Sequence, residues 1–434
     1  MNISVFGTGY VGLVTGVCLA NLGHNVVCYD IDKNKIKLLN CGKVPFFEPQ
    51  VEKLVIENSQ EGKINFTTDI KIATENCEII FIAVGTPQKE SGKADLSYVK
   101  KVAEQIGKNI SAYTVIVNKS TVPIGTGNLV RDIIQNECDV EFDIISNPEF
   151  LREGSAVDDF LNPERIIIGS DSQRANFIIN KLYKDFSCPI INTDIETAEM
   201  IKYASNAFLA TKISFVNEIA NICEKVGANI DDVSYAMGLD SRIGNKFLNA
   251  GIGYGGSCFP KDIKALSNIA LSHDYDFELL KSVIKVNTNQ RLFLINKIKK
   301  LIGNLEGKKI CVWGIAFKPN TDDIRESAAI DIMSLLHNEN VIVNAYDPQV
   351  NYDYVRNHKK ITGKINLYSD KYDALENCDA LIIATEWEEL RKPDFDKIDE
   401  ILINPIIVDG RNIYSPVEMK KLGFKYVSVG RKEI

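Results

Sequence analysis

Residues 7–12 read Gly7-Thr8-Gly9-Tyr10-Val11-Gly12, and this stretch decides the fold of the N-terminal part. It lies between an apolar run at residues 3–6 and a helical pattern at residues 14–20, and a second apolar run follows at residues 26–29. A G-x-G-x-x-G motif between a strand and a helix is typical of a βαβ unit that binds a dinucleotide. Its glycines let the backbone approach the pyrophosphate, whose charge is attracted by the helix N-terminus. The sequence therefore predicts a Rossmann domain with these cofactor-binding residues: Gly7, Gly9, Tyr10, Val11 and Gly12.

The second apolar run ends at Asp30, which indicates the kind of dinucleotide. A carboxylate at this place accepts hydrogen bonds from both ribose hydroxyls and repels a 2′-phosphate. We therefore expect NAD rather than NADP. The alternative, in which the glycines serve packing alone, leaves the carboxylate unexplained.

Composition limits the class of protein. The chain has 434 residues, of which 45% are hydrophobic, so it is long enough for two or three domains with real cores. Its net charge of −8 argues against nucleic acid or an anionic membrane as the main partner. Residues 1–29 carry no formal charge, but glycines interrupt their apolar pattern, so we interpret them as a βα unit rather than a signal peptide and expect a cytoplasmic protein.

The ten cysteines and four histidines of the chain do not form metal-binding or disulfide patterns. The cysteines are scattered, and no C-x-x-C motif occurs. Neither a zinc site nor a disulfide framework is expected, and the prediction is that no metal is bound.

Polar loops follow three further apolar runs, at residues 78–84, 114–117 and 143–146. Ligands in open α/β sheets lie beyond the carboxyl ends of the strands, so these loops are expected to line one cleft. A single loop Thr or Glu is usually a turn or cap residue, but three converging loops favour a functional site. Thr121, Glu149 and Glu153 are candidates by position.

A long helix is predicted from residue 193 to Gly227, because apolar residues recur there at helical spacing. At about 1.5 Å per residue it would extend roughly 50 Å, enough to join two domains. Lys202 and Asn206 are four residues apart and share one face. In isolation such a pair would be interpreted as part of the solvated surface. Because the helix follows a cofactor domain, we interpret the lysine as a cation and the asparagine as an amide donor that together bind an alcohol oxygen or an oxyanion.

Cys258 lies in the run Gly255-Gly256-Ser257-Cys258-Phe259-Pro260-Lys261-Asp262. A dehydrogenase that only transfers a hydride needs no nucleophile, so a thiol on a glycine-rich turn suggests covalent capture of an oxidised intermediate. Oxidation beyond the aldehyde, to a carboxylate, is therefore predicted. The glycine-rich residues 249–256 can offer N–H groups to a phosphate, and a helix is predicted from Asp262 toward Asn289.

A second βαβ pattern begins at Lys308, with strands at residues 310–313, 341–346, 380–385 and 406–409. It lacks a G-x-G-x-x-G motif, which favours a mononucleotide or a nucleotide sugar over a second dinucleotide. The predicted fold class is α/β, with two Rossmann-like doubly wound domains joined by a long central helix.

The ordered motifs resemble, over essentially the full chain, the UDP-glucose/GDP-mannose dehydrogenase family and especially its UDP-glucose 6-dehydrogenase branch. The resemblance implies oxidation of UDP-glucose to UDP-glucuronate with two NAD+ and without release of the aldehyde. It also implies three domains: an NAD-binding Rossmann domain at residues 1–192, a helical dimerisation domain at 193–300 and a UDP-sugar-binding domain at 301–434. The matching motifs are Gly7 to Gly12, Gly85-Thr86-Pro87, Ser120-Thr121-Val122-Pro123, Asn147-Pro148-Glu149-Phe150-Leu151, Lys202 with Asn206, Gly255 to Asp262, Ala316-Phe317-Lys318 and Asp409-Gly410-Arg411.

The resemblance implies catalytic roles for six residues. Cys258 would form a thiohemiacetal and then a thioester, while Lys202 and Asn206 would stabilise oxyanions. Asp262 and Thr121 would hold a water, and Glu149 would be the other acid/base group. Which carboxylate moves which proton is left open.

The resemblance also implies binding positions, including an Arg242 that reaches the substrate of a neighbouring subunit in a homodimer. The NAD positions, besides the glycine motif, are Asp30, Lys35, Thr86, Thr121, Glu153 and Arg325. The substrate positions are Glu149, Phe150, Leu151, Arg152, Glu153, Lys202, Asn206, Arg242, Asn249, Tyr254, Gly255, Cys258, Phe317, Lys318 and Arg411.

Three alternatives share part of this pattern. A sister enzyme that oxidises GDP-mannose or a UDP-N-acetylhexosamine would share the mechanism. A β-hydroxyacid dehydrogenase would share the Lys-x-x-x-Asn pair but leave residues 308–434 unexplained, and a non-catalytic NAD-binding regulator would require a lost catalytic position, of which none is found. The departures from the family pattern are minor: Ala83 where cysteine is frequent and Glu164 where aspartate is common.

Overall fold

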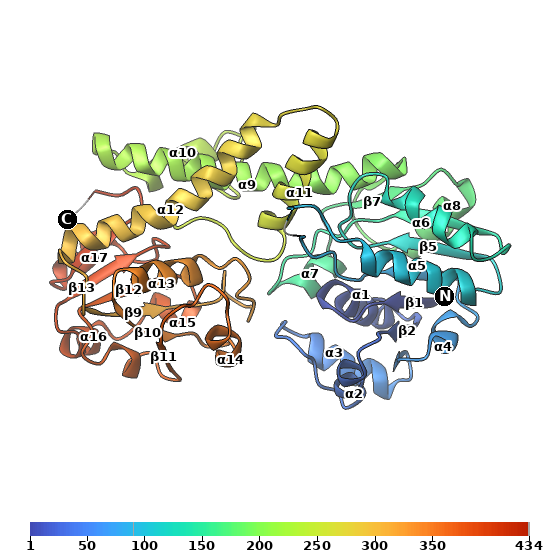
Figure 1. The fold of residues 1–434 in the computed structure, drawn as a ribbon, viewed down its shortest axis with the longest axis horizontal. Coiled ribbons are helices and arrows are strands. Elements are labelled where there is room, and N and C mark those ends of the chain that lie inside the picture. The colour runs from blue at the N-terminus through green and yellow to red at the C-terminus, as the bar shows by residue number, and fades with distance from the viewer. Residues whose placement is uncertain (90, 433–434) are drawn as a thin grey trace. The chain divides into compact units, whose positions relative to one another are not determined.

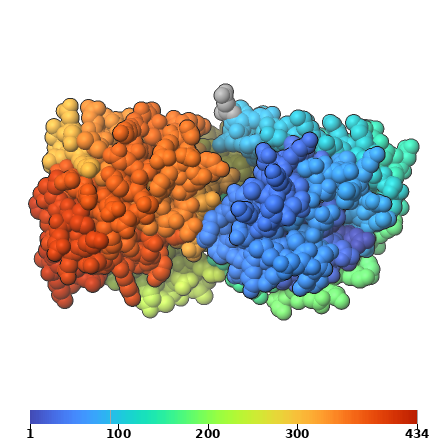
Figure 2. Space-filling view, turned by 90° about the horizontal axis from the view of Figure 1, so that it is seen from below, coloured from blue at the N-terminus to red at the C-terminus, as the bar shows by residue number. Residues whose placement is uncertain are grey.

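The structure is a computed structural model that describes residues 1–89 and 91–432. The chain forms two compact units (Figure 1). The first comprises Met1–Ser205 and Lys264–Asp274, and the second comprises Asn206–Ile263 and the chain from Tyr275 onward. In Figure 2 the first is recognised by its blue-to-cyan surface and the second by its orange-to-red surface. The three domains expected from the sequence stay a prediction, because a division of the chain into compact units does not test functional domain boundaries.

The first unit contains an eight-stranded sheet of order β3-β2-β1-β4-β5-β6-β7-β8. Strands β6 and β7 pair antiparallel at Ser146 and Gly169, and the other neighbouring strands pair in parallel. The strand order reverses between β1 and β4, which is where doubly wound sheets bind ligands. The strands are β1 Asn2–Phe6, β2 Asn25–Tyr29, β3 Ile64–Thr67, β4 Ile79–Ile82, β5 Thr114–Asn118, β6 Phe142–Ser146, β7 Ile166–Gly169 and β8 Ile190–Thr193.

Helices cover both faces of this sheet, as expected for parallel strands with apolar residues on both sides. One core contains residues of α1, α3, α7 and α8, and the opposite core contains residues of α4, α5 and α6. The helices are α1 Tyr10–Asn21, α2 Lys33–Asn40, α3 Val51–Gln60, α4 Ile70–Thr74, α5 Ser97–Asn109, α6 Thr126–Gln135, α7 Ala156–Leu161 and α8 Gln173–Leu182.

The second unit contains a six-stranded parallel sheet of order β11-β10-β9-β12-β13-β14. Its core surrounds Trp313, which is fully buried. Its strands are β9 Lys309–Trp313, β10 Ile342–Tyr346, β11 Ile365–Tyr368, β12 Ala380–Ile383, β13 Ile406–Asp409 and β14 Lys425–Ser428. Its shorter helical elements are α10 Ile230–Gly238, α13 Ala328–Asn338, α14 Tyr352–Arg356, η1 Asp373–Leu375, α15 Glu388–Arg391, α16 Phe395–Ile401 and α17 Pro416–Lys421.

The predicted central helix is α9, Ile195–Val226, a continuous helix of 32 residues. The predicted fold class, two Rossmann-like α/β domains with a long central helix, is thereby confirmed. The single helix expected from Asp262 toward Asn289 is wrong: the structure has α11, Phe259–Ser272, and α12, Glu278–Ile302. Asp274 lies between them with φ +55°, a left-handed conformation that ends α11. Among the described residues, no helix is both long and apolar enough to cross a membrane.

Candidate active site

The glycine motif forms the turn from β1 into α1. Gly7 has φ +102°, and a Cβ added there would lie 2.8 Å from the carbonyl oxygen of Ala83. A Cβ on Gly12 would lie 1.9 Å from the carbonyl oxygen of Gly7, so a side chain is excluded. Helix α1 then begins at Tyr10 with no acidic residue in its first turn. Its N-terminal dipole thus favours an anionic group such as a pyrophosphate.

Asp30 follows β2 and is nearly buried, with 9% of its surface exposed. Its Oδ2 accepts hydrogen bonds from the backbone N and the Oγ1 of Thr8, both at 2.8 Å. Its Oδ1 accepts from the backbone N of Asp32 at 2.9 Å, and Lys35 Nζ lies 3.9 Å from Oδ2. Burial opposes ionisation, but the hydrogen bonds from Asp32 and Thr8 outweigh it and hold the pKa of Asp30 below its usual value. The carboxylate is therefore ionised and fixed beside the glycine turn, as a ribose acceptor must be.

Asp30→Asn should raise the KM for NAD by about 10- to 100-fold, because a hydrogen bond to a charged acceptor contributes about 1.5–3 kcal/mol. The kcat at saturating NAD should stay near wild type, since the change affects binding of the cofactor alone. Initial rates with NAD and NADP test this, and the preference for NAD over NADP should fall because the charge that repels the 2′-phosphate is gone. An unchanged preference would contradict the role assigned to Asp30.

Two further loops of the first unit are joined to each other. Thr86 Oγ1, after β4, donates a hydrogen bond to the carbonyl oxygen of Thr121, after β5, at 2.9 Å. Ser120 Oγ donates to the carbonyl oxygen of Val84 at 2.7 Å. The structure thus brings two of the predicted NAD residues together at the carboxyl edge of the sheet.

Glu48, which no motif in the sequence indicates, organises the loop that contains Glu153. This buried carboxylate accepts hydrogen bonds from the Tyr10 hydroxyl, from Gly154 N at 2.5 Å and from Ala156 N at 2.8 Å. It thereby links the start of α1 to the start of α7. Its signal in the sequence is weak, because a single glutamate in a loop has no motif around it.

Glu149 and Lys202 form a buried ion pair in the first unit, with Glu149 Oε1 3.0 Å from Lys202 Nζ and both side chains 5% exposed. Glu149 Oε2 accepts from the backbone N of Leu151 at 2.6 Å. The Lys202 ammonium lies 5.2 Å from the centre of the Phe150 ring. Arg152 is turned to Asp159 instead, at 2.5 Å, and its side chain is 61% exposed. A buried carboxylate and ammonium in contact are suited to proton transfer and to stabilising an oxyanion.

Cys258, Asp262 and Asn206 belong to the second unit. Cys258 immediately precedes α11, and its carbonyl oxygen accepts the hydrogen bond of Asp262 N at 2.9 Å, so the thiol lies at the N-cap. The buried Asp262 carboxylate accepts from Asn206 Nδ2 at 2.7 Å and pairs with Lys261 Nζ at 2.6 Å. Cys258 is partly exposed. The arrangement provides a presented thiol one helical turn from a fixed carboxylate.

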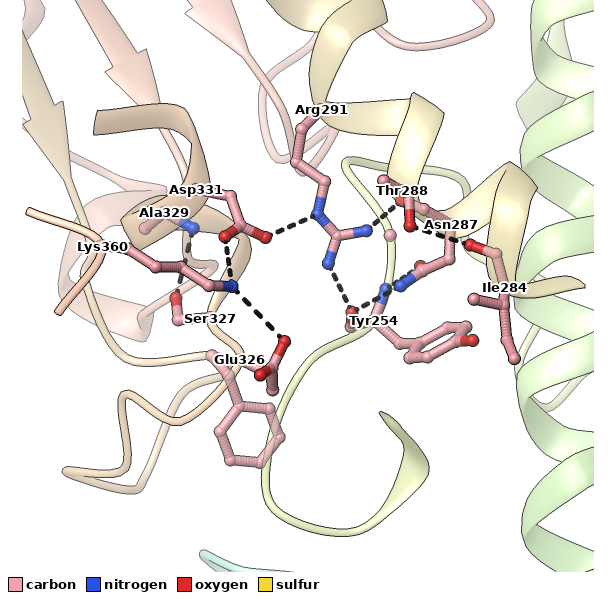
Figure 3. A network of polar contacts seen from close by, with 12 residues as sticks. Tyr254, Ile284, Asn287, Thr288, Arg291, Glu326, Ser327, Ala329, Asp331 and Lys360 are labelled. Atoms are coloured by element: carbon pink, nitrogen blue, oxygen red, sulfur yellow. Dashed lines mark hydrogen bonds and ion pairs between the residues drawn. The ribbon is translucent and has the colours of Figure 1, made fainter. Parts of the chain in front are cut away.

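Arg291 of α12 fixes the glycine-rich loop that leads to Cys258 (Figure 3). Its Nη2 donates to the carbonyl oxygen of Tyr254 at 2.7 Å, and its Nε lies 3.5 Å from Asp331 Oδ2. The Asn287 side chain binds both backbone groups of Tyr254. Tyr254 N donates to Asn287 Oδ1 at 2.8 Å, and Asn287 Nδ2 donates to Tyr254 O at 3.1 Å. Lys360 then connects Asp331, at 2.7 Å, to Glu326, at 3.4 Å. The loop is therefore held by α12, and Asp331 of α13 pairs in turn with Arg291 of that helix.

Gly253→Ala should destabilise the protein and raise the KM for the nucleotide sugar. Gly253 has φ +91°, which costs a residue with a side chain about 1–3 kcal/mol. The added Cβ would also lie 2.4 Å from Asn287 Oδ1 and 2.7 Å from Arg291 Nη1, which must move. Denaturant unfolding and substrate kinetics measure both effects.

Gly423→Ala is the matched control for this prediction. Gly423 has φ +86°, but its added Cβ meets nothing within 4 Å. This variant should therefore lose only the unfolding free energy that a left-handed backbone conformation costs a residue with a side chain. Its KM for the nucleotide sugar should be unchanged. If Gly253→Ala loses no more unfolding free energy than Gly423→Ala, the predicted clash of its Cβ with Asn287 and Arg291 would be contradicted.

Arg411 binds backbone carbonyl groups of three segments. Its Nε donates to Ala384 O at 2.9 Å, its Nη1 to Gly253 O at 3.2 Å and its Nη2 to Phe317 O at 3.4 Å. The Glu386 carboxylate lies 3.3 Å from Nε. A Cβ on Gly256 would lie 2.7 Å from the Phe317 ring, so this ring packs directly on the loop. The structure thus brings Tyr254, Gly255, Phe317 and Arg411 together.

The remaining predicted positions make local contacts of their own. Arg325 belongs to the second unit, unlike the other predicted NAD residues, and its guanidinium pairs with Asp323 at 2.7 Å. The Arg242 side chain is 87% exposed and pairs with Asp240 at 2.5 Å. Asn249 is exposed, and Lys318 Nζ lies 5.6 Å from the Phe317 ring. Within residues 1–89 and 91–432, no three His, Cys, Asp or Glu side chains are placed to hold a metal ion.

A Rossmann unit with a glycine turn and a carboxylate placed for a ribose defines a dinucleotide-binding protein. Three family models match this chain: the NAD binding domain of the UDP-glucose/GDP-mannose dehydrogenase family at residues 1–187, its central domain at 196–289 and its UDP binding domain at 311–416. The chain belongs to the UDP-glucose/GDP-mannose dehydrogenase family. The predicted family, the oxidoreductase class, the NAD cofactor and a nucleotide-sugar substrate are thereby confirmed.

Curated relatives and solved structures agree with this assignment. The chain is 49% identical to UDP-glucose 6-dehydrogenase TuaD of Bacillus subtilis over 100% of this chain and 94% of that protein. It is 46% identical to UDP-glucose 6-dehydrogenase of Rhizobium meliloti over 100% of both. A UDP-glucose dehydrogenase from Pyrobaculum islandicum superposes with a TM-score of 0.89 at 36% identity, covering 95% of this chain and 94% of that one.

Proposed function

We propose that the protein oxidises C6 of UDP-glucose to the carboxylate of UDP-glucuronate and reduces two NAD+. The observation that carries this proposal is the thiol of Cys258 at the N-cap of α11, one turn from the buried Asp262 carboxylate. A hydride transfer to a single NAD+ requires no such nucleophile. Relatives that are 42–49% identical to the chain are UDP-glucose 6-dehydrogenases, which supports the choice of sugar nucleotide.

The proposed reaction has four steps. The C6 alcohol loses a hydride and a proton to give the aldehyde, and NAD+, when bound, supplies the hydride acceptor. The Cys258 thiolate adds to the carbonyl carbon to form a thiohemiacetal, which loses a second hydride and becomes a thioester. Water then cleaves the thioester, releasing the carboxylate and restoring the thiol. Four electrons leave the sugar, and one water supplies the second carboxylate oxygen.

The other residues of the proposed site act on the developing charges and on water. Lys202 and Asn206, four residues apart on α9, donate to the oxyanions at C6. Asp262 and Thr121 hold the hydrolytic water, and Glu149 accepts or returns a proton. The engagement of Asp262 by Asn206 and Lys261 supports its fixed position.

The proposed binding positions extend these roles to both ligands. NAD is proposed to contact the glycine motif and Asp30, Lys35, Thr86, Thr121, Glu153 and Arg325. The nucleotide sugar is proposed to contact the loops around Glu149, Tyr254 and Arg411, which the structure holds through backbone hydrogen bonds.

The yield of NADH from limiting UDP-glucose tests the reaction. Two NADH and one UDP-glucuronate per sugar are expected, measured by absorbance and mass spectrometry. One NADH per sugar would overturn the covalent route. Two NADH from GDP-mannose or UDP-N-acetylmannosamine, and none from UDP-glucose, would keep the mechanism and overturn the substrate.

We also propose a homodimer formed through α9. Four apolar side chains of this helix are more than half exposed and recur on one side at spacings of seven, seven and four: Phe208, Phe215, Ile222 and Val226. The exposed Arg242 fits a residue that reaches the partner's substrate. Sedimentation of wild type and Phe215→Glu tests this, with a dimer and a monomer as the expected species. A monomeric wild type would overturn it.

A cytoplasmic location is proposed as well. Residues 2–29 form β1, α1 and β2 of the folded Rossmann unit, so this uncharged stretch is part of the fold. Cell fractionation tests the proposal, with activity expected in the soluble fraction.

A further inference from the structure

Lys119 is a buried lysine that the proposed reaction does not yet use. It follows β5 and is 6% exposed, and its Nζ donates a hydrogen bond to Asn147 Oδ1 at 2.9 Å. Its backbone N donates to Ile82 O, and Asn147 N donates to Asn118 O, both at 2.9 Å. The ammonium is therefore fixed at the carboxyl edge of the first sheet, where β4, β5 and β6 end.

The charged groups that act on this ammonium are Glu149, two residues after Asn147, and Lys202 of α9. These two form the buried ion pair described above, at 3.0 Å. The first unit thus contains a cluster of two cations and one anion, the Lys119–Glu149–Lys202 cluster. A neutral Tyr183 hydroxyl faces the same amide oxygen of Asn147, at 2.8 Å.

Lys119 is not needed to hold Asn147 in place. Asn147 Oδ1 already accepts from Tyr183, and Asn147 Nδ2 donates to Ile167 O at 2.7 Å. Burying an ammonium costs free energy that an apolar side chain of similar volume avoids. Burial lowers the pKa of Lys119 to about 8, an effect that Glu149 opposes and Lys202 reinforces. The buried Lys119 ammonium is unfavourable for stability, and its hydrogen bond to Asn147 is not required. We therefore expect its positive charge to have a function.

The charge balance of the cluster points to such a use. Glu149 and Lys202 together are neutral, so on their own they stabilise a developing oxyanion weakly. With Lys119 the cluster has a net charge of +1, and Glu149, which pairs with Lys202, also attracts the Lys119 ammonium. We propose that Lys119 is a positioning residue that supplies this net charge and, by attracting Glu149, keeps the Lys202 ammonium available to the substrate oxyanion. The inference rests on the proposed function, in which Lys202 stabilises that oxyanion.

Lys119→Met, with Tyr183→Phe as the matched control, tests the proposal. Lys119→Met should lower kcat by about 10- to 100-fold at pH 7, less than loss of a direct oxyanion donor, and leave both KM values near wild type. Wild-type kcat should fall above pH 8, where Lys119 loses its proton, toward the value of the variant. The variant itself should lack that basic limb. Tyr183→Phe removes a hydrogen bond to the same Asn147 oxygen without a change of charge, and should keep the wild-type kcat and pH profile.

A stability measurement separates this proposal from the proposed function. The folded protein binds the Lys119 proton more weakly than the unfolded chain, whose lysine pKa is 10.5. Between pH 8 and 10.5 the unfolded state therefore holds more protons, so the unfolding free energy of wild type should rise relative to that of Lys119→Met. Absence of this rise, a wild-type pH profile in Lys119→Met, or equal defects in Tyr183→Phe would each overturn the role of Lys119. If the unfolding free energy rises as expected but the wild-type protein oxidises no sugar nucleotide, the proposed function would be overturned.

Discussion

Replacement of Cys258 by serine should abolish steady-state oxidation of UDP-glucose to the carboxylate. A serine hydroxyl is far less ionised than a thiol at neutral pH, so addition to the aldehyde is slow. We expect kcat to fall by at least about 10³-fold, a loss typical of removing a catalytic nucleophile. In a single turnover, one NADH per active site should appear, followed by a stalled second oxidation. Stopped-flow absorbance at excess enzyme measures both phases.

Cys41→Ser is the control for the Cys258→Ser experiment. Cys41 is an exposed cysteine outside the proposed site, so this variant should keep wild-type turnover. Iodoacetamide should inactivate wild type and Cys41→Ser alike, and UDP-glucose should protect both. If Cys258→Ser still yielded two NADH per sugar at the wild-type rate, the thiol would be structural.

Lys202→Met should reduce both activity and stability. Removal of one partner from a buried ion pair leaves the Glu149 carboxylate with less compensation, which costs about 3–5 kcal/mol in other proteins. We expect the lower end, about 3 kcal/mol, because the positive charge of Lys119 still attracts Glu149. The kcat should fall by about 10²–10³-fold, as for loss of one oxyanion donor.

The double variant Glu149→Gln with Lys202→Met separates the two effects. Two neutral side chains replace the ion pair, so much of the lost unfolding free energy should return while activity stays low. Lys225→Met, an exposed lysine in the last turn of α9, is the control and should behave as wild type. A Lys202→Met protein with wild-type kcat would contradict the oxyanion role.

The first Rossmann unit was predictable because its signals are local. The glycine motif, the apolar runs and Asp30 follow one another within thirty residues, and each has a single physical interpretation. Strands β3, β8 and β11 were harder to recognise. They include exposed or half-buried residues, such as Asn65, Ile191 and Asn366, so they lack a continuous apolar run.

The contacts that support the proposed site were less predictable than its candidate residues. Cys258 and the Lys202–Asn206 pair belong to recognisable patterns, but Arg291, Glu48 and Lys119 act through partners far away in the sequence. Arg291 binds Tyr254 O, 37 residues away, and Glu48 binds the amide of Gly154, 106 residues away. Such pairs arise from packing of the whole unit, which spacing along the chain does not report. The break at Asp274 was missed because the residue is not a glycine, although it takes a left-handed conformation.

The path of the chain through the two units has a consequence for biosynthesis. The chain leaves the first unit after Ser205, returns to it at Lys264 and leaves it again after Asp274. A nascent chain therefore cannot complete the first unit until residue 274 has left the ribosome. The loop before Cys258 obtains one of its contacts later in synthesis, because Arg411 donates a hydrogen bond to Gly253 O. The Cys258 thiol thus acquires these fixed surroundings only after residue 411 has left the ribosome.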